Sequence, residues 1–444
     1  MSIFARSSRF FALVGLSAVV FGCGGGGTSS VPPALSAPDY LVENHAVQKT
    51  VNTPVTYQLN IAHTGAASDQ RMKLPLSIVW KRTFGPTSVT YPIAAQGVVY
   101  VGSGSSLYAL DATTGNTLWQ QAASEAGLDW VGAAYDNGVI FAQETGNELF
   151  ALDAKTGKQL WQATLPDQNV FSSPPTAANG VVYTAGSGTG GDVYALSETT
   201  GHLLWEQNVL NGENSSPAVT RDAVYVSYEC LNTYAFNVSS GSIIWKFPGN
   251  CDASNGWTPV LFDSNVYVEG NTYPQLPEPT TPPFMTPPPS LGVILGAANG
   301  GIRGVVNTNF PPAFADHVGY ALEINATYTQ NDLVAFNAKT GGQLWAAPPP
   351  SGDNFEMPAI VVDGVVYDVT NLGTFLAFDS HSGRQLESLS LGAPAIGVPS
   401  YPHSISLGLA VSPGRMIAPD GSSVVALGAA AVPTPSPRPS RSPR

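Results

Sequence analysis

The sequence ALDATTGNTLW at residues 109–119 recurs along the chain and decides the fold class. It returns almost unchanged as ALDAKTGKQLW at residues 151–161, and a weaker copy, AFDSHSGRQLE, ends on Glu387 in place of tryptophan. Self-similarity at a fixed period is the sequence signature of a repeat architecture. The other copies that end on tryptophan are ALSETTGHLLW (195–205), AFNVSSGSIIW (235–245) and AFNAKTGGQLW (335–345).

Each copy has the chemistry of a β-hairpin. Alternating apolar residues end one strand, an Asp or Asn side chain caps the turn, and Gly takes the position that needs a positive φ. A second strand follows and ends on Trp. Upstream of the hairpins, a Pro precedes a Val-rich strand by several residues, as Pro92 precedes Tyr100, which adds two more strands. Four strands per repeat of ~42 residues predict a β-propeller blade.

The sequence therefore predicts an all-β fold, a β-propeller of four-stranded blades closed by strands from both termini. Residues 77–81 (SIVWK) resemble a lone fourth strand, and residues 409–427 resemble a blade that lacks one. Successive turn glycines are 40 to 44 residues apart, but one interval is 100 residues long and holds only one further Trp hairpin. We therefore predict seven blades and a Pro-rich insertion at about 270–317. The alternative is eight blades, with residues 291–325 supplying a degenerate one.

The repeat A-x-D-x-x-T-G-x-x-x-W resembles the tryptophan-docking repeat of quinoprotein-type (PQQ-like) β-propellers over residues 76–430. That family includes the PQQ-dependent dehydrogenases and non-enzymatic outer-membrane assembly lipoproteins of the BamB type. The resemblance implies that each tryptophan docks between adjacent blades, and that the blade with Glu387 is the least well docked. The docking residues implied are Trp80, Trp119, Trp161, Trp205, Trp245 and Trp345.

Composition agrees with this fold class and excludes others. Only 11% of the residues are charged, while the chain has 46 Gly and 37 Pro, which disfavours a helix-rich fold. Hydrophobic residues reach 43%, which excludes wholesale disorder. The net charge is −13, and the basic residues that are present gather partly at the two ends. This balance excludes a nucleic-acid partner and an anionic membrane surface.

The two ends of the chain carry export and tail features. Arg6 and Arg9 precede twelve apolar residues, and the run ends at VFGC, which resembles a bacterial lipobox with Cys23 as the lipidated residue. We expect a lipoprotein signal peptide at 1–22, a flexible tether and N-terminal segment at 23–75, and a disordered Pro/Ser/Arg tail at 431–444. The expected location is outside the cytoplasm, on the periplasmic face or cell surface of a bacterial membrane. An ordinary signal peptide with a chance Cys is the alternative.

Two further cysteines, Cys230 and Cys251, are candidates for a disulfide. An oxidising compartment favours such a bridge. In the predicted topology Cys230 lies in a loop between second and third strands and Cys251 in an interblade loop, and both kinds of loop share one face. Two unpaired thiols are the alternative.

The interblade loops repeatedly combine an acid or Asn with an aromatic residue, and the topology places all of them on one face around the channel mouth. Such a ring could bind a cation, a cationic ligand or a partner loop. Turn formation and packing between blades are the alternative explanation. The candidates for partner binding are Asp129, Trp130, Asp167, Phe171, Glu213, Asp252, Trp257, Asp353, Phe355 and Glu356.

Catalytic signatures are weak in this sequence. It contains no H-E-x-x-H, G-K-[ST] or C-x-x-C motif, and the six histidines are scattered, so we expect them on the surface. We predict no catalytic residue, no metal and no cofactor. The expected function is a non-enzymatic, lipid-anchored scaffold that binds a protein partner in the cell envelope, with its oligomeric state left open. The alternative, implied by the resemblance, is a PQQ-dependent alcohol or sugar oxidoreductase that uses PQQ and Ca²⁺.

Overall fold

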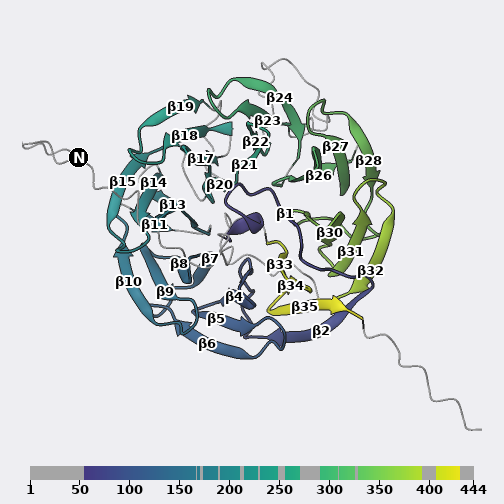
Figure 1. Cartoon of the computed structure of the whole chain (residues 1–444), viewed down its shortest axis with the longest axis horizontal. Helices are drawn as coiled ribbons and strands as arrows, with labels where there is room; N and C mark the ends of the chain where they lie inside the picture. The colour runs from purple at the N-terminus through teal and green to yellow at the C-terminus, as the bar shows by residue number, and fades with distance from the viewer. Residues whose placement is uncertain are drawn as a thin grey trace, which may run out of the picture. The chain divides into compact units, whose positions relative to one another are not determined.

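The computed structural model describes residues 55–166, 168–170, 174–188, 191–210, 215–228, 231–248, 256–270, 291–308, 310–325, 329–392 and 407–430. These residues belong to one unit, which spans 51–444. Within it, eight antiparallel sheets stand around a central channel as the blades of a propeller (Figure 1). The fold is therefore the expected all-β propeller of four-stranded blades. The preferred count of seven blades is wrong, and the alternative of eight is correct.

The first four blades follow one another along the chain, each running from its innermost to its outermost strand. Three short strands, β1 (Ala66–Ala67), β11 (Gln168–Val170) and β20 (Gly256–Trp257), pair with blades from outside this pattern. Blade 1 comprises β3 (Ile93–Ala95), β4 (Val98–Ser103), β5 (Ser106–Asp111) and β6 (Thr117–Ala122); blade 2 comprises β7 (Trp130–Asp136), β8 (Val139–Glu144), β9 (Glu148–Asp153) and β10 (Gln159–Thr164); blade 3 comprises β12 (Thr176–Ala178), β13 (Val181–Gly188), β14 (Asp192–Ser197) and β15 (Leu203–Asn208); blade 4 comprises β16 (Ala218–Val219), β17 (Ala223–Tyr228), β18 (Thr233–Asn237) and β19 (Ile243–Phe247).

The last four blades complete the ring. Blade 5 comprises β21 (Val260–Phe262), β22 (Asn265–Val268), β23 (Leu291–Gly296) and β24 (Ile302–Asn307); blade 6 comprises β25 (Ala313–Ala315), β26 (Val318–Ile324), β27 (Asn331–Asn337) and β28 (Gln343–Ala347); blade 7 comprises β29 (Ile360–Val362), β30 (Val365–Val369), β31 (Thr374–Asp379) and β32 (Gln385–Ser390); blade 8 comprises β33 (Ala410–Ser412), β34 (Arg415–Asp420), β35 (Ser423–Ala429) and β2 (Leu76–Thr83).

The long interval between turn glycines contains all four strands of blade 5 and the three inner strands of blade 6. The expected Pro-rich insertion at about 270–317 is therefore wrong for residues 291–315, which form β23, β24 and β25. The outer hairpin of blade 5 was not recognised from the sequence because it lacks two features of the repeat. Its outermost strand, IRGVVN, has no tryptophan, and its turn, AANGG at residues 297–301, lacks the usual Thr-Gly.

Blade 8 is built from both ends of the described chain. Strand β2 pairs antiparallel with β35, and Trp80 lies opposite Ala426 in the register. Lys81 also forms an ion pair with the buried Asp420. Because β2 precedes all other blade strands in sequence, this one sheet joins residues 76–83 to residues 410–429.

Tryptophan side chains fasten six of the eight blades to the blade that follows. The indole N–H donates a hydrogen bond of 2.7–3.0 Å to a backbone carbonyl in the turn of the following blade, and the ring lies against that turn's glycine. Glu387, at the corresponding position of blade 7, contacts blade 8 by accepting a 2.7 Å hydrogen bond from the Leu76 N–H. The blade that presents no side chain at this position is blade 5. The docked tryptophans are Trp80, Trp119, Trp161, Trp205, Trp245 and Trp345.

Candidate functional site

The central channel is occupied by the chain's own residues 55–70, which we call the channel segment. It comprises a 3-10 turn, η1 (Tyr57–Leu59), and β1, and η1 lies at the middle of the ring (Figure 1). The sequence analysis assigned residues 23–75 to a flexible tether and an N-terminal segment and gave neither a place in the fold, whereas the structure packs residues 55–70 into the propeller. This segment is the main element that the sequence analysis missed.

The channel segment contacts all eight blades: it first meets blades 2, 3 and 1, and then follows the ring in order from blade 4 to blade 8. Val55 pairs with Tyr135 in blade 2, and the Thr56 hydroxyl donates to the Pro175 carbonyl beside blade 3. The Gln58 N–H donates to the Tyr91 hydroxyl beside blade 1. The carbonyls of the segment then accept N–H groups from the inner strands of blades 4 to 7 and from the inner turn of blade 8. These pairs are Val219 to Ile61, Leu261 to Ala62, Phe314 to Thr64, Val361 to Gly65 and Gly414 to Gln70, at 2.6–2.9 Å.

The innermost strands explain why such a segment is needed. The inner edge of a blade has no neighbouring strand, so its backbone N–H groups need other partners when water is excluded. The channel segment supplies carbonyls to these groups. It fits closely: a Cβ added to Gly65, whose φ is +59°, would lie 3.0 Å from the Ala313 Cβ and 3.2 Å from the Ala359 carbonyl. Only glycine suits both that space and that backbone conformation.

Aromatic and polar side chains of the segment are buried. The Tyr57 ring lies 4.6 Å from the Tyr91 ring and 6.0 Å from the His63 ring, centroid to centroid. His63 is 0% exposed, so the expectation that the histidines lie on the surface is wrong for this one. Its Nδ1 lies 3.1 Å from the Pro259 carbonyl, which requires that nitrogen to carry the proton and donate. Burial raises the pKa of Tyr57 well above its ordinary value.

His63 makes the stability of the propeller depend on pH. Burial lowers its pKa from 6.5 to about 4, so the folded state resists protonation. The unfolded chain takes up the proton first, so the stability due to neutral His63 is complete above pH 6.5 and is lost as the pH falls through 4. We expect His63→Gln to reduce the fall in melting temperature between pH 7 and pH 4, whereas His202→Gln, at an exposed turn, leaves it unchanged. Equal pH profiles of wild type and His63→Gln would contradict the assignment.

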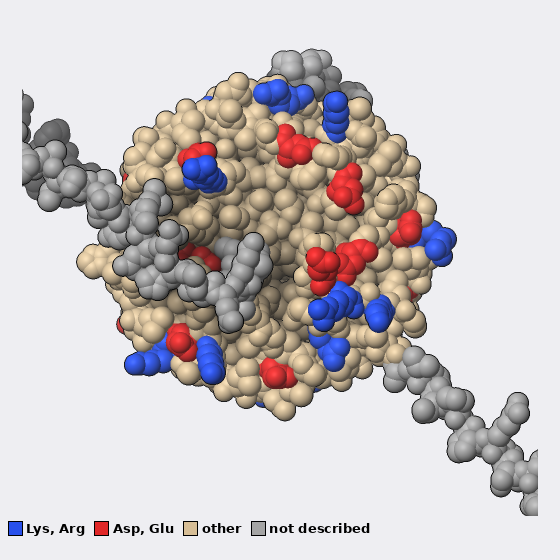
Figure 2. Space-filling model, in the orientation of Figure 1, with Lys and Arg blue, Asp and Glu red and all other residues tan. Residues whose placement is uncertain are grey.

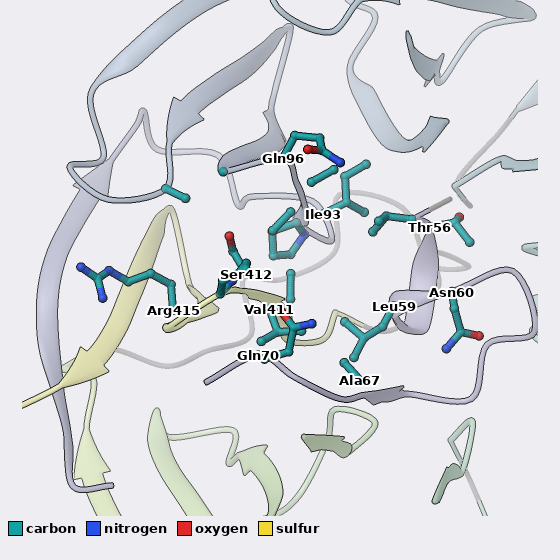
Figure 3. Close-up of a pocket in the computed structure, with 18 of the residues that line it drawn as sticks. Thr56, Leu59, Asn60, Ala67, Gln70, Ile93, Gln96, Val411, Ser412 and Arg415 are labelled. Atoms are coloured by element: carbon teal, nitrogen blue, oxygen red, sulfur yellow. The ribbon is translucent and has the colours of Figure 1, made fainter. Parts of the chain in front are cut away.

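A cavity of about 770 Å³ lies between the channel segment and the inner strands of blades 1 and 8. Figure 3 shows Thr56, Leu59 and Asn60 of the segment around this space with Ile93 and Val411. Arg415 extends away from it, and its Nη1 comes within 2.7 Å of where a Cβ on Gly428 would lie. The lining includes turns between first and second strands, such as Gln96–Gly97, so the cavity lies toward the face opposite the interblade loops.

The cavity does not fit a PQQ–Ca²⁺ pair. Ca²⁺ is held by several oxygen ligands, commonly carboxylates. The described residues that line this cavity include no Asp or Glu. Among the described residues as a whole, no group of three His, Cys, Asp or Glu side chains is close enough to hold a metal ion.

Two buried acids near the inner ends of the blades escaped the sequence analysis. Burial raises the pKa of both Glu269 and Asp368 well above the ordinary range, and each carboxylate accepts a backbone hydrogen bond, from Thr258 and Val369 respectively. Burial therefore favours the neutral form of both carboxyl groups in the folded protein. Each follows or interrupts a Val-rich second strand in which consecutive residues are buried, so their position in such a strand is the sequence signal that could have placed them inside.

The structure separates the candidate partner-binding residues into two groups. Trp130 and Phe355 are 2% and 0% exposed, and they pack on Phe150 and Phe378, so neither is available as a surface anchor. The acids are partly exposed but have local partners. Asp353 accepts a hydrogen bond from the Thr370 hydroxyl and Glu356 from the Asn354 amide, which shapes the loop between blades 6 and 7. The backbone N–H of Asp129 donates to the Thr145 hydroxyl.

Several sequence candidates lie outside the described residues, so the structure does not place them. Trp257 is described only by its backbone, in β20. The unplaced candidates are Cys23, Asp167, Phe171, Glu213, Cys230, Cys251 and Asp252.

The surface of the propeller carries little charge on the face that Figure 2 shows, where the charged side chains form small separate groups on a mostly uncharged surface. Among the described residues, no helix reaches the length and apolar character of a membrane span.

Comparisons with known proteins agree with the fold. A family model described as outer membrane protein assembly factor BamB matches residues 75–169, 103–268 and 299–430. The tetrathionate hydrolase of Acidithiobacillus ferrooxidans is 26% identical over 217 residues, which span 44% of this chain and 40% of the hydrolase. The alignment with this curated relative thus spans less than half of its length.

Two solved structures share the architecture. The quinohemoprotein alcohol dehydrogenase from Comamonas testosteroni superimposes with a TM-score of 0.64 and 13% identity, covering 86% of this chain and 81% of that one. BamB from Moraxella catarrhalis superimposes with a TM-score of 0.58 and 15% identity, covering 80% of this chain and 99% of that one. At such identities the similarity establishes the shared fold alone.

Proposed function

The chain belongs to the family described as outer membrane protein assembly factor BamB, a group of PQQ-like β-propellers, and we propose that it is a non-enzymatic scaffold of the cell envelope. Its role in this proposal is to hold a protein partner. Function in such folds depends on the site rather than on the architecture, so the proposal needs support from the channel and the loops.

The channel segment is the observation that carries the proposal. A quinoprotein enzyme needs a flat stacking pocket, a carboxylate and Ca²⁺ ligands in its channel. In this chain residues 55–70 hydrogen-bond to every blade there. Releasing the segment would leave the inner N–H groups of four blades without their partners, which is costly. This favours a channel with a structural role and a binding function on the outer surfaces.

We place the partner on the interblade-loop face, with Asp129, Asp353 and Glu356 as the described candidates. The candidates outside the described residues stay predictions for the same face, and so does a bridge between Cys230 and Cys251. Export through a signal peptide at 1–22 and an anchor on Cys23 complete the proposal. The words "outer membrane" in the family description support this location.

Recovery of a partner from membrane extract tests the scaffold. We expect full-length protein to retain an envelope protein, and the charge-removing pair Asp353→Asn and Glu356→Gln to recover it several-fold less, because charges at the edge of an interface steer association. Lys155→Glu with Lys158→Glu, in an exposed turn of the opposite face, is the matched control. Unchanged recovery by the folded Asp353/Glu356 variant would remove this face, and no partner at all would reject the scaffold.

We further infer that blade 8 acts as the closure of the ring. The seven paired residues of β2 support this, because they cover the edge of β35 and leave no described strand of the last blade unpaired. A PQQ-dependent oxidoreductase is the alternative function, since the fold also resembles a quinohemoprotein alcohol dehydrogenase.

A further inference from the structure

Six junctions between neighbouring blades share one arrangement, in which a tryptophan of one blade packs on the turn of the next; we call this site a dock. In each, the indole N–H donates to a backbone carbonyl in the turn of the next blade. The accepting residue directly follows the Asp, Asn or Ser that begins the turn, or the residue that stands in its place. The ring lies so close to the turn glycine that an added Cβ would meet an indole carbon at 2.6–2.7 Å. These glycines are buried or half-buried. They are Gly115, Gly157, Gly201, Gly241, Gly300 and Gly383.

The dock between blades 5 and 6 has the same turn but no indole. The turn Asn337–Gly342 keeps its hydrogen bonds: Asn337 caps it through Oδ1, and the Gly341 N–H donates to the Asn337 carbonyl at 2.8 Å. Gly341 also keeps the positive φ, at +70°. Yet it is exposed, and a Cβ added to it would meet no atom of the described residues within 4 Å. The receiving half of the dock is therefore formed and open.

The β-sheet register explains the opening. In blade 1, Ala109 lies opposite Trp119, and the register then shifts by one residue. In blade 5 the same shift follows the pair of Ile294 and Gly304, so Gly304 stands where the other blades have tryptophan. Ile294 replaces the usual Ala and fills part of the space. Among the described residues, a Cβ added to Gly304 would meet only the Ile294 Cδ1, at 3.6 Å, so they leave room for a larger side chain there.

The chemistry of the open dock is that of the six filled ones. The Ala338 carbonyl, which corresponds to the acceptors of the indole N–H groups, accepts only a long 3.4 Å hydrogen bond from the Tyr267 hydroxyl among the described residues. An underused acceptor beside an unfilled apolar position suits an aromatic side chain with an N–H.

We propose that this dock binds a tryptophan side chain presented by a partner protein, at the rim between blades 5 and 6. The inference rests on the proposed scaffold function and adds a second contact surface to it. The chain offers few tryptophans of its own for this role, because six are docked and Trp130 is buried. Trp257 of a second copy is the other occupant to test.

A short peptide with one central tryptophan, and the same peptide with alanine, is the direct probe. With the full-length protein labelled at its Ile and Val methyl groups, we expect saturable shifts at Ile294 and Val305 with the tryptophan peptide only. The variant Gly304→Trp with Ile294→Ala recreates the Ala–Trp pair of the other blades, so it should melt at a higher temperature and bind the peptide about ten-fold more weakly or not at all. Gly304→Leu blocks the same space with one surface substitution and serves if the double variant folds poorly.

The outcomes separate this inference from the scaffold proposal. No saturable shift in the wild type, or equal peptide affinity in the folded Gly304→Leu variant, would overturn the tryptophan dock and leave the partner recovery unaffected. Dimers of the wild type that disappear in both Gly304→Leu and Trp257→Phe would overturn the assigned partner in favour of a second copy. Recovery of an envelope partner that is lost with Gly304→Leu would support the dock as assigned.

Discussion

Replacing Trp119 by Ala is expected to lower the free energy of unfolding by about 3–5 kcal/mol, as measured by chemical denaturation. The Trp119 side chain is 8% exposed, and its N–H donates to the Ala154 carbonyl at 3.0 Å. Its removal opens a cavity against Gly157 and leaves the junction of blades 1 and 2 without its docked indole. Because the blades form a ring, one weak junction should destabilise the whole propeller.

Leu118→Ala is the matched control for that loss. Leu118 is the neighbour of Trp119 on the same strand, but it is 51% exposed on the outer rim, so we expect a change within about 0.5 kcal/mol. A loss for Leu118→Ala as large as that for Trp119→Ala would contradict blade docking as the reason.

Replacing Tyr57 by Ala is expected to cost a similar amount, about 3–5 kcal/mol. Tyr57 is 1% exposed at the middle of the channel, where its ring contacts Tyr91 and His63. Without the ring, the 3-10 turn loses the packing that holds it among the inner strands. Thermal and chemical unfolding of the variant should show a single transition at lower stability, since the segment contacts all the blades.

Tyr57→Phe keeps the ring and removes only the hydroxyl, so we expect a change of at most about 1–2 kcal/mol. If Tyr57→Ala were no less stable than Tyr57→Phe, the channel segment would be an accessory of the fold and not a part of its core. Protection of the Leu261 and Phe314 amides from hydrogen exchange gives an independent reading, because both donate to the segment.

The repeated hairpins were enough to predict most of the fold from the sequence. The parts that were not predicted were missed for physical reasons. The turn glycine and tryptophan are needed for docking, so they mark each blade wherever the dock is filled. Blade 5 escaped because Gly304 stands at the tryptophan position. The count of seven blades followed from treating that one signal as obligatory.

The channel segment was beyond the repeat signal for a different reason. It has no period, because the carbonyls that pair with successive blades, from Ile61 to Gln70, are unevenly spaced along it. One indication was present: residues 51–67 contain no charged residue and little of the Gly, Ser and Pro that a tether uses. Trp130 and Phe355 were misjudged because a loop position near a strand start can face either solvent or the neighbouring blade. Their burial on Phe150 and Phe378 is decided by packing that one sequence does not reveal.

Titration of the full-length protein with PQQ in the presence of Ca²⁺, followed by calorimetry and by dye reduction with alcohols and sugars, tests the filled channel most directly. Residues 55–70 hold the inner strands of the propeller, so we predict no saturable binding of PQQ and no turnover. Stoichiometric binding of PQQ with turnover would contradict the account, because the channel segment would then have to leave or share the space that it occupies in this structure.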